Sequence, residues 1–346
     1  MISSICFLTT YQCTARCDYC ECGPDTRGSI GLADMKRLMD EGLTLGTVAL
    51  VVFSGGEPTL LGRDLFEAIR YANDRGVLTR LVTNGWWGRT AEEACDYVDR
   101  LLEAGLHEIN ISIDDLHQRW IGLEQVKNAF LACYQKQLRC LIAHKQTLDA
   151  KITRSFLEEY FGLELIPFDY TKTYEGDEQY RLISTTTVIP VGRNEQFADM
   201  SRHRITPWKG SCGSVLREIV VGADMRLLPC CGIVSKYIPE LTRNSLDTTS
   251  LIDAIDEANN DPVLNFLALE GPASLMDFIK KHDNGIEFED DYAGICHACN
   301  EVLTREDCRR ILNRHYDELE YRVSVHRAYF EGIRAIPHLV QSYIRR

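Results

Sequence analysis

Short apolar runs alternate with amphipathic stretches over the first two-thirds of this 346-residue chain. Strand-like runs lie at 5–10, 48–53, 78–83, 108–113, 139–143 and 185–191, and helix-like stretches lie near 32–45, 64–75, 90–104, 117–135 and 150–161. Because buried strands separated by amphipathic helices favour parallel pairing, the pattern predicts βαβ units. Six strands are too few to close an eight-stranded barrel. We therefore expect an α/β fold with an open, partial barrel that binds its ligands at the carboxyl ends of the strands.

The composition limits the compartment and the partners. The net charge of −13 argues against nucleic-acid binding, and no apolar run approaches the roughly 18 residues of a membrane helix. The first 13 residues do not have the pattern of a secretory signal, so we expect a cytoplasmic protein without a membrane partner. Disulfides are disfavoured in the cytoplasm, so the clustered members of the 14 cysteines indicate metal or redox chemistry.

Three of these cysteines follow the first predicted strand. Cys13, Cys17 and Cys20 form a C-x3-C-x2-C triplet, and Cys22 lies just beyond it. Three thiolates on one tight loop can hold three irons of a four-iron, four-sulfur cube and leave the fourth iron open. The alternative is a zinc loop, although structural zinc usually has four protein ligands.

A second motif, Gly55-Gly56-Glu57-Pro58, directly follows the second predicted strand. Glycines let the backbone come close to a ligand, and the Glu57 carboxylate can hold a cationic amine. The alternative is an ordinary turn between a strand and a helix. Because both motifs follow strands of one parallel sheet, we expect them to face the same crevice.

Together the two motifs resemble those of the radical S-adenosylmethionine (SAM) superfamily. The resemblance implies a partial (β/α)6 barrel in which Cys13, Cys17 and Cys20 bind a [4Fe-4S] cluster. It also implies that SAM fills the open iron, with its amine held by Gly55, Gly56 and Glu57. An external flavodoxin-like or ferredoxin-like donor would reduce the cluster. SAM cleavage would then give a 5′-deoxyadenosyl radical that abstracts a substrate hydrogen atom.

Polar side chains also follow the later predicted strands. By their position in the superfamily, they are expected to contact the ribose, the adenine or the carboxylate of SAM. These residues are Asn84, Ser112, Asp114, Val191 and Arg193. Helix capping and turn formation are the alternative roles. His117 could be an acid or base in the pocket, or a structural histidine.

The late cysteines form a second group. Cys212 and Cys230 flank a predicted hairpin made of residues 217–221 and 226–228, and Cys296-x2-Cys299 follows. This spacing resembles the twitch domain, which is half of the SPASM domain. The resemblance implies that these four cysteines bind one auxiliary [4Fe-4S] cluster, with zinc as the alternative. The hairpin departs from the family pattern at Met225, where glycine is common, and Cys308 stands alone.

Cys231 directly follows Cys230 and is either a buried thiol, a substitute ligand or a hydrogen donor. Five segments resemble those of the radical SAM epimerases that modify ribosomally synthesised precursor peptides: residues 16–20, 84–88, 111–117, 228–231 and 295–299. The resemblance implies that Cys231 returns a hydrogen atom after Cα abstraction and so converts an L-residue into a D-residue. The alternatives are a peptide cross-linking maturase, or a dehydrogenase of a sugar or cyclitol.

We divide the chain into the barrel at 1–205, an auxiliary-cluster domain at 206–308 and a helical tail at 309–346. The tail has apolar residues at helical spacing, which predicts one or two amphipathic helices packed on the core: Leu312, Leu319, Val323, Phe330 and Ile333. A non-catalytic iron–sulfur carrier is disfavoured, because a carrier needs neither an open triplet nor Glu57.

Overall fold

A computed structural model describes residues 1–20, 28–191, 194, 210–231, 238 and 245–334. Among them, nine strands form one sheet in the order β6-β7-β5-β4-β3-β2-β1-β8-β9. The strands are β1 (Ser4–Leu8), β2 (Leu50–Ser54), β3 (Leu78–Thr83), β4 (Glu108–Ser112), β5 (Arg139–Gln146), β6 (Ile166–Pro167), β7 (Leu182–Thr187), β8 (Glu218–Val221) and β9 (Leu227–Leu228). Every pairing is parallel except that of β8 with β9. The predicted α/β class with a parallel sheet is confirmed.

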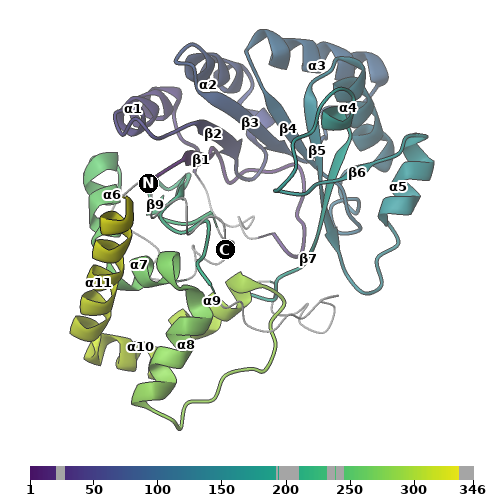
Figure 1. Cartoon of the computed structure of the whole chain (residues 1–346). Helices are drawn as coiled ribbons and strands as arrows, with labels where there is room; N and C mark the ends of the chain where they lie inside the picture. Colours follow the sequence, from purple (N-terminus) through teal and green to yellow (C-terminus); the bar gives the residue numbers. More distant parts are fainter. Residues whose placement is uncertain (21–27, 192–193, 195–209, 232–237, 239–244, 335–346) are drawn as a thin grey trace.

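Five helices lie along the outer side of the curved sheet (Figure 1): α1 (Leu32–Leu43), α2 (Arg63–Asn73), α3 (Ala91–Glu103), α4 (Leu123–Gln135) and α5 (Arg154–Phe161). Burial alternates along most of β1 to β5, as β1 illustrates. Ile5 and Phe7 are fully buried in the core, whereas Cys6 and Leu8 are partly exposed on the opposite, concave face. The concave face is therefore the side on which a ligand can reach the strands.

The sixth predicted strand was misplaced, because β7 spans Leu182–Thr187 rather than 185–191. Pro190 has no backbone N–H and cannot continue the ladder with β5, so the chain leaves the sheet before it. Val191 is fully buried in a second hydrophobic core, and the prediction that it follows a strand end is wrong. Arg193 and Cys22 lie outside the described residues.

The predicted hairpin is present, with Val220 opposite Leu228. Its first strand, β8, pairs with β1 and so continues the barrel sheet past its first strand. The turn begins at Gly222 and contains Met225 at φ +59°, in the left-handed region where glycine is more common. The hairpin therefore joins the cysteine-rich C-terminal part to the edge of the barrel.

The described residues after the hairpin form six helices: α6 (Leu251–Asn259), α7 (Pro262–Leu269), α8 (Gly271–His282), α9 (Ile295–Thr304), α10 (Glu306–Arg314) and α11 (Tyr316–Arg334). The second core lies among the last five. Leu312, Leu319 and Val323 are buried in it, which confirms the predicted packing of the tail helices. The side chains of Phe330 and Ile333 lie outside the described part. None of the described helices is long and apolar enough to cross a membrane.

Candidate active site

A cavity of about 330 Å³ lies at the carboxyl ends of β1 to β5. It is lined by residues of the cysteine loop, of the glycine turn and of the later strand ends: Cys13, Ala15, Cys17, Tyr19, Cys20, Ser54, Gly55, Gly56, Val82, Thr83, Asn84, Ser112, His117 and Lys145. The structure thus brings the cysteine triplet, both glycines, Asn84 and Ser112 together in one cavity. Its volume is in the range of cofactor and small-molecule sites.

Gly55 and Gly56 support the cysteine loop directly. The N–H of Gly56 donates to the carbonyl of Thr10 at 2.6 Å, and the N–H of Glu57 donates to the carbonyl of Gln12 at 2.8 Å. A Cβ at residue 56 would lie 2.2 Å from the oxygen of Gln12, and one at residue 55 would lie 2.5 Å from that of Thr10. Both glycines are therefore required by the close approach of the two loops, and Gly55 also has a φ of +134°.

Glu57 does not line the cavity, which differs from its expected contact with an amine. The residue is fully buried, and its Oε1 accepts hydrogen bonds from the hydroxyls of Thr59 at 2.6 Å and Thr83 at 2.8 Å. Its Oε2 accepts from the backbone N–H of Asn84 at 2.8 Å. Burial raises the pKa of Glu57, although these hydrogen bonds oppose the shift. Glu57 therefore fixes the ends of β2 and β3 to each other, and the backbone of Gly55 and Gly56 faces the cavity.

Asn84 connects this buried carboxylate to the cysteine loop. Its Nδ2 donates to the hydroxyl of Thr14 at 3.0 Å and lies 3.6 Å from the Sγ of Cys13. Its Oδ1 accepts from the N–H of Trp86, so the orientation of the amide is fixed. Asn84 can therefore donate to a thiolate at position 13.

Asp114 organises the opposite wall of the cavity. It is fully buried, and its Oδ2 accepts from the hydroxyl of Tyr19 at 3.0 Å and lies 2.8 Å from Nδ1 of His117. Burial alone would raise the pKa of Asp114, but the adjacent His117 and the hydrogen bonds lower it overall. Asp114 therefore contributes a buried negative charge that holds Tyr19 and His117, which themselves line the cavity.

Lys145 is the site residue that sequence reasoning missed, because β5 was predicted to end at residue 143. On the longer strand, Lys145 follows Ala143 on the concave face and lines the cavity. Burial lowers the pKa of Lys145, while the charge of Asp114 opposes the shift. Among the described residues, its ammonium group makes no hydrogen bond or ion pair. Alternate side chains of a strand point to the same face, so a predicted strand longer by two residues would have placed Lys145 on the concave face.

Cys13 and Cys17 are neutral thiols in the absence of a metal. Burial raises the pKa of Cys13 to about 11 and that of Cys17 to about 12. Thiols in such surroundings become thiolates when a metal cation replaces the proton. Three such groups on one cavity wall match the donor set of an iron–sulfur cluster with one open iron.

The four late cysteines gather at the second core. Cys230 and Cys299 are buried in it, and Cys212 and Cys296 pack against it half-buried. Burial raises the pKa of Cys299, and the neighbouring Cys296 and Cys212 raise it further, so these three thiols lie close to one another. Cys308 is buried separately on α10.

Cys231 has different surroundings from Cys230. It is exposed, and its Sγ donates a hydrogen bond to Oε2 of Glu218 on β8 at 2.5 Å. Glu218 also acts electrostatically on Cys6, which lies on the concave face of β1. Cys231 therefore lies at the edge of the barrel interior, on the side of β1 and β8.

Comparisons with known proteins agree with this arrangement. The chain is 20% identical over 84% of its length to a putative peptide biosynthesis protein, YydG of Bacillus subtilis, and covers 89% of that protein. It is 26% identical to the AdoMet-dependent heme synthase of Methanosarcina barkeri, over 58% of this chain and 55% of that one. The solved structure of anSMEcpe with bound AdoMet and the Cp18Cys peptide has the same fold, with a TM-score of 0.54 and 14% identity over 93% of this chain and 99% of that one. Residues 7–146 match the model of the radical SAM superfamily, so the chain contains a radical SAM domain.

Proposed function

We propose that this enzyme epimerises L-residues to D-residues in a ribosomally synthesised precursor peptide. The superfamily implies a [4Fe-4S] cluster and SAM. When bound and reduced, they supply a 5′-deoxyadenosyl radical that removes a hydrogen atom from the substrate. The peptide as substrate is supported by two relatives, one described as a peptide biosynthesis protein and one solved with a bound peptide.

Different residues of the cavity would hold the cluster and the different parts of SAM. Cys13, Cys17 and Cys20 would bind three irons, and the Gly55–Gly56 backbone would lie against the amine of SAM. The ammonium of Lys145, which is unpaired among the described residues, would hold an anionic group, for which the SAM carboxylate is the candidate. Ser112 and the pair of Tyr19 and Asp114 complete the wall expected to face the nucleoside.

An auxiliary [4Fe-4S] cluster would be bound by the cysteine group at the second core: Cys212, Cys230, Cys296 and Cys299. The proximity of three of these thiols and the burial of Cys230 support this assignment. Cys296 also acts electrostatically on Lys145 and raises the pKa of its ammonium group. Four thiolates give a closed cluster suited to electron transfer rather than to substrate binding.

The observation that carries epimerisation is that Cys230 and Cys231, although adjacent in sequence, have different surroundings. Cys230 is buried against the other late cysteines, whereas Cys231 is exposed and hydrogen bonded to Glu218. A cluster ligand must be a thiolate, but a hydrogen-atom donor must keep its S–H bond. The hydrogen bond from Cys231 to Glu218 is one that only the protonated thiol can make.

The hydrogen return transfers one hydrogen atom from the thiol to the substrate radical. The Cα radical takes a hydrogen atom from Cys231, which forms a C–H bond on the opposite face and leaves a thiyl radical on Cys231. One electron from an external flavodoxin-like or ferredoxin-like donor and one proton then restore the thiol. Glu218 is in contact with the sulfur and would deliver that proton.

The test uses the anaerobically reconstituted holoenzyme with SAM, reductant and peptides encoded beside its gene, in deuterated water. Each inverted residue should gain one deuterium with no other mass change, because the Cys231 thiol exchanges with the solvent. Cys231→Ala should still form 5′-deoxyadenosine but no D-residue. Cys95→Ala, at a half-buried cysteine on α3, is the matched control and should retain epimerisation. Normal D-residue formation by Cys231→Ala would show that Cys231 is not the hydrogen donor.

A second candidate function is oxidation or cross-linking of the peptide. The electrostatic contact of Cys296 with the cavity residue Lys145 favours it, because a closed cluster bound by the late cysteines could accept an electron from a substrate radical. The same assay separates the two functions, since oxidation or cross-linking removes two mass units from the product. That outcome with no deuterium in the product would replace the epimerase proposal.

A further inference from the structure

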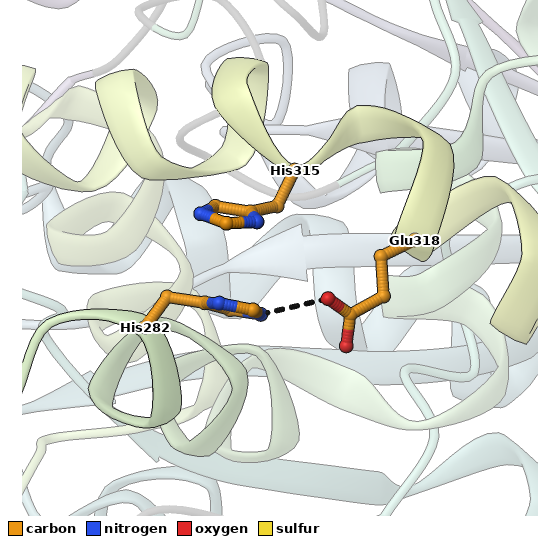
Figure 2. Close-up of side chains that lie close together, drawn as sticks. All are labelled: His282, His315 and Glu318. Carbon is orange, nitrogen blue, oxygen red and sulfur yellow. Dashed lines mark ion pairs between the residues drawn. The ribbon is translucent and has the colours of Figure 1, made fainter.

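Three metal-ligating side chains meet at the junction of α8, α10 and α11 (Figure 2). His282 is the last residue of α8, His315 caps the C-terminus of α10, and Glu318 lies in the first turn of α11. One ligand atom from each lies within 4.8 Å of the others. In the part of the chain that the structure describes, no other group of three histidine, cysteine or carboxylate side chains meets this distance.

The two imidazole rings lie nearly parallel to each other. Their centroids are 3.7 Å apart and their planes differ by 21°. Neutral imidazole is the form of histidine that binds metals. One ring nitrogen of each histidine lies on the side of the Glu318 carboxylate, as Figure 2 shows.

Among the residues that the structure describes, Nε2 of His282 has no hydrogen-bond partner. This atom is inaccessible to solvent, and Glu318 Oε2 lies 3.0 Å away from it as an ion-pair contact. Buried polar atoms normally have a partner, and a missing one often marks an absent ion or water. Glu318 shares its other oxygen with Lys281, whose Nζ lies 2.7 Å from Oε1, so Oε2 faces His282.

We propose that His282, His315 and Glu318 bind a zinc ion. Two imidazoles and one carboxylate form a donor set that zinc binds readily, whereas calcium and magnesium prefer oxygen ligands alone. Glu318 is partly exposed, with 39% of its side chain accessible, so water can supply the fourth ligand. Imidazole lone pairs lie in the ring plane, so one ring of the stack must rotate out of it for both to reach one ion.

The ion would fasten the tail helices to the rest of the C-terminal part. His282 packs edge-on against Phe278 of the second core, with ring centroids 4.8 Å apart. His315 lies between α10 and α11, Glu318 lies in the first turn of α11, and Leu312 of α10 and Leu319 of α11 are buried in the same core. Zinc would therefore connect α8 to this turn and stabilise the docking of α11.

The test is zinc binding to the holoenzyme with its clusters assembled, so that the cluster cysteines are occupied. Calorimetric titration of the wild type with Zn²⁺ should show one site that His315→Ala weakens by at least about tenfold, because a ligand is removed. Zinc should also raise the melting temperature of the wild type and leave that of His315→Ala unchanged.

Two further variants distinguish the loss of a zinc ligand from a general loss of structure. Glu318→Gln keeps the side-chain shape and should weaken zinc binding as well. His326→Ala removes another α11 histidine, which lies near Glu270 instead, and should bind zinc as the wild type does. Equal zinc affinity in the wild type and His315→Ala, or no zinc site in the wild type, would overturn the proposal.

Discussion

The thiol of Cys231 donates a hydrogen bond to the carboxylate of Glu218 at 2.5 Å, across 13 positions of sequence. The contact forms because β8 and β9 are antiparallel, which returns the chain after Leu228 to the start of β8. Since β8 itself pairs with β1, the hairpin holds the thiol at the edge of the barrel. The pairing of two strands thus positions the proposed hydrogen donor.

Glu218→Gln should separate hydrogen return from thiol regeneration. The amide oxygen can still accept the S–H bond, but the amide cannot deliver a proton. We expect a nearly normal yield of D-residue in a single turnover and a fall of about 100-fold in multiple turnovers, the usual size of a proton-transfer contribution. Glu67→Gln, at an exposed pair with Arg70, is the control and should change neither rate. A single-turnover yield that falls as steeply as the steady-state rate would contradict a role in regeneration.

Asn84→Ala should make the first cluster harder to reduce. The Nδ2 of Asn84 lies 3.6 Å from the Sγ of Cys13, and hydrogen bonds to ligand sulfurs raise a cluster's potential. One net hydrogen bond of about 1 kcal/mol corresponds to a shift of about 40 mV for one electron. A redox titration followed by electron paramagnetic resonance measures this shift. Thr14→Ser keeps the hydroxyl that Asn84 contacts, and its potential should match the wild type. An unchanged potential in Asn84→Ala would exclude the contact.

Much of this site followed from local sequence patterns, and the remainder depended on tertiary contacts. The strand and helix periodicity located β1 to β5 closely, so the triplet and the glycine turn were correctly predicted to share one crevice. The burial of the Glu57 carboxylate could not be predicted, because its partners Thr83 and Asn84 come from the next βα unit. The pairing of β8 with β1 was also unpredictable, since no local pattern specifies which edge a hairpin joins.

Lys145→Met should weaken SAM binding without weakening the fold. A partly buried ammonium without a partner costs free energy, and its removal should leave the melting temperature unchanged or raised. A charge-assisted hydrogen bond contributes about 1.5–3 kcal/mol, so the Kd for SAM should rise about 10-fold to 100-fold. Anaerobic calorimetry on the holoenzyme gives the Kd, with the exposed Lys172→Met as the control. A lower melting temperature with an unchanged Kd would mean that Lys145 is structural.

Gly56→Ala should damage the cluster site through the backbone alone. The added Cβ would lie 2.2 Å from the carbonyl oxygen of Gln12, so the cysteine loop must move away from the glycine turn. Overpacking of this kind costs about 1–3 kcal/mol, and we expect a lower melting temperature together with a lower iron content per chain. Gly31→Ala is the matched control, because its Cβ would meet only Asp34 Oδ2 at 3.6 Å, an ordinary contact. Full iron content in Gly56→Ala would show that the cysteine loop does not depend on its close packing against this turn.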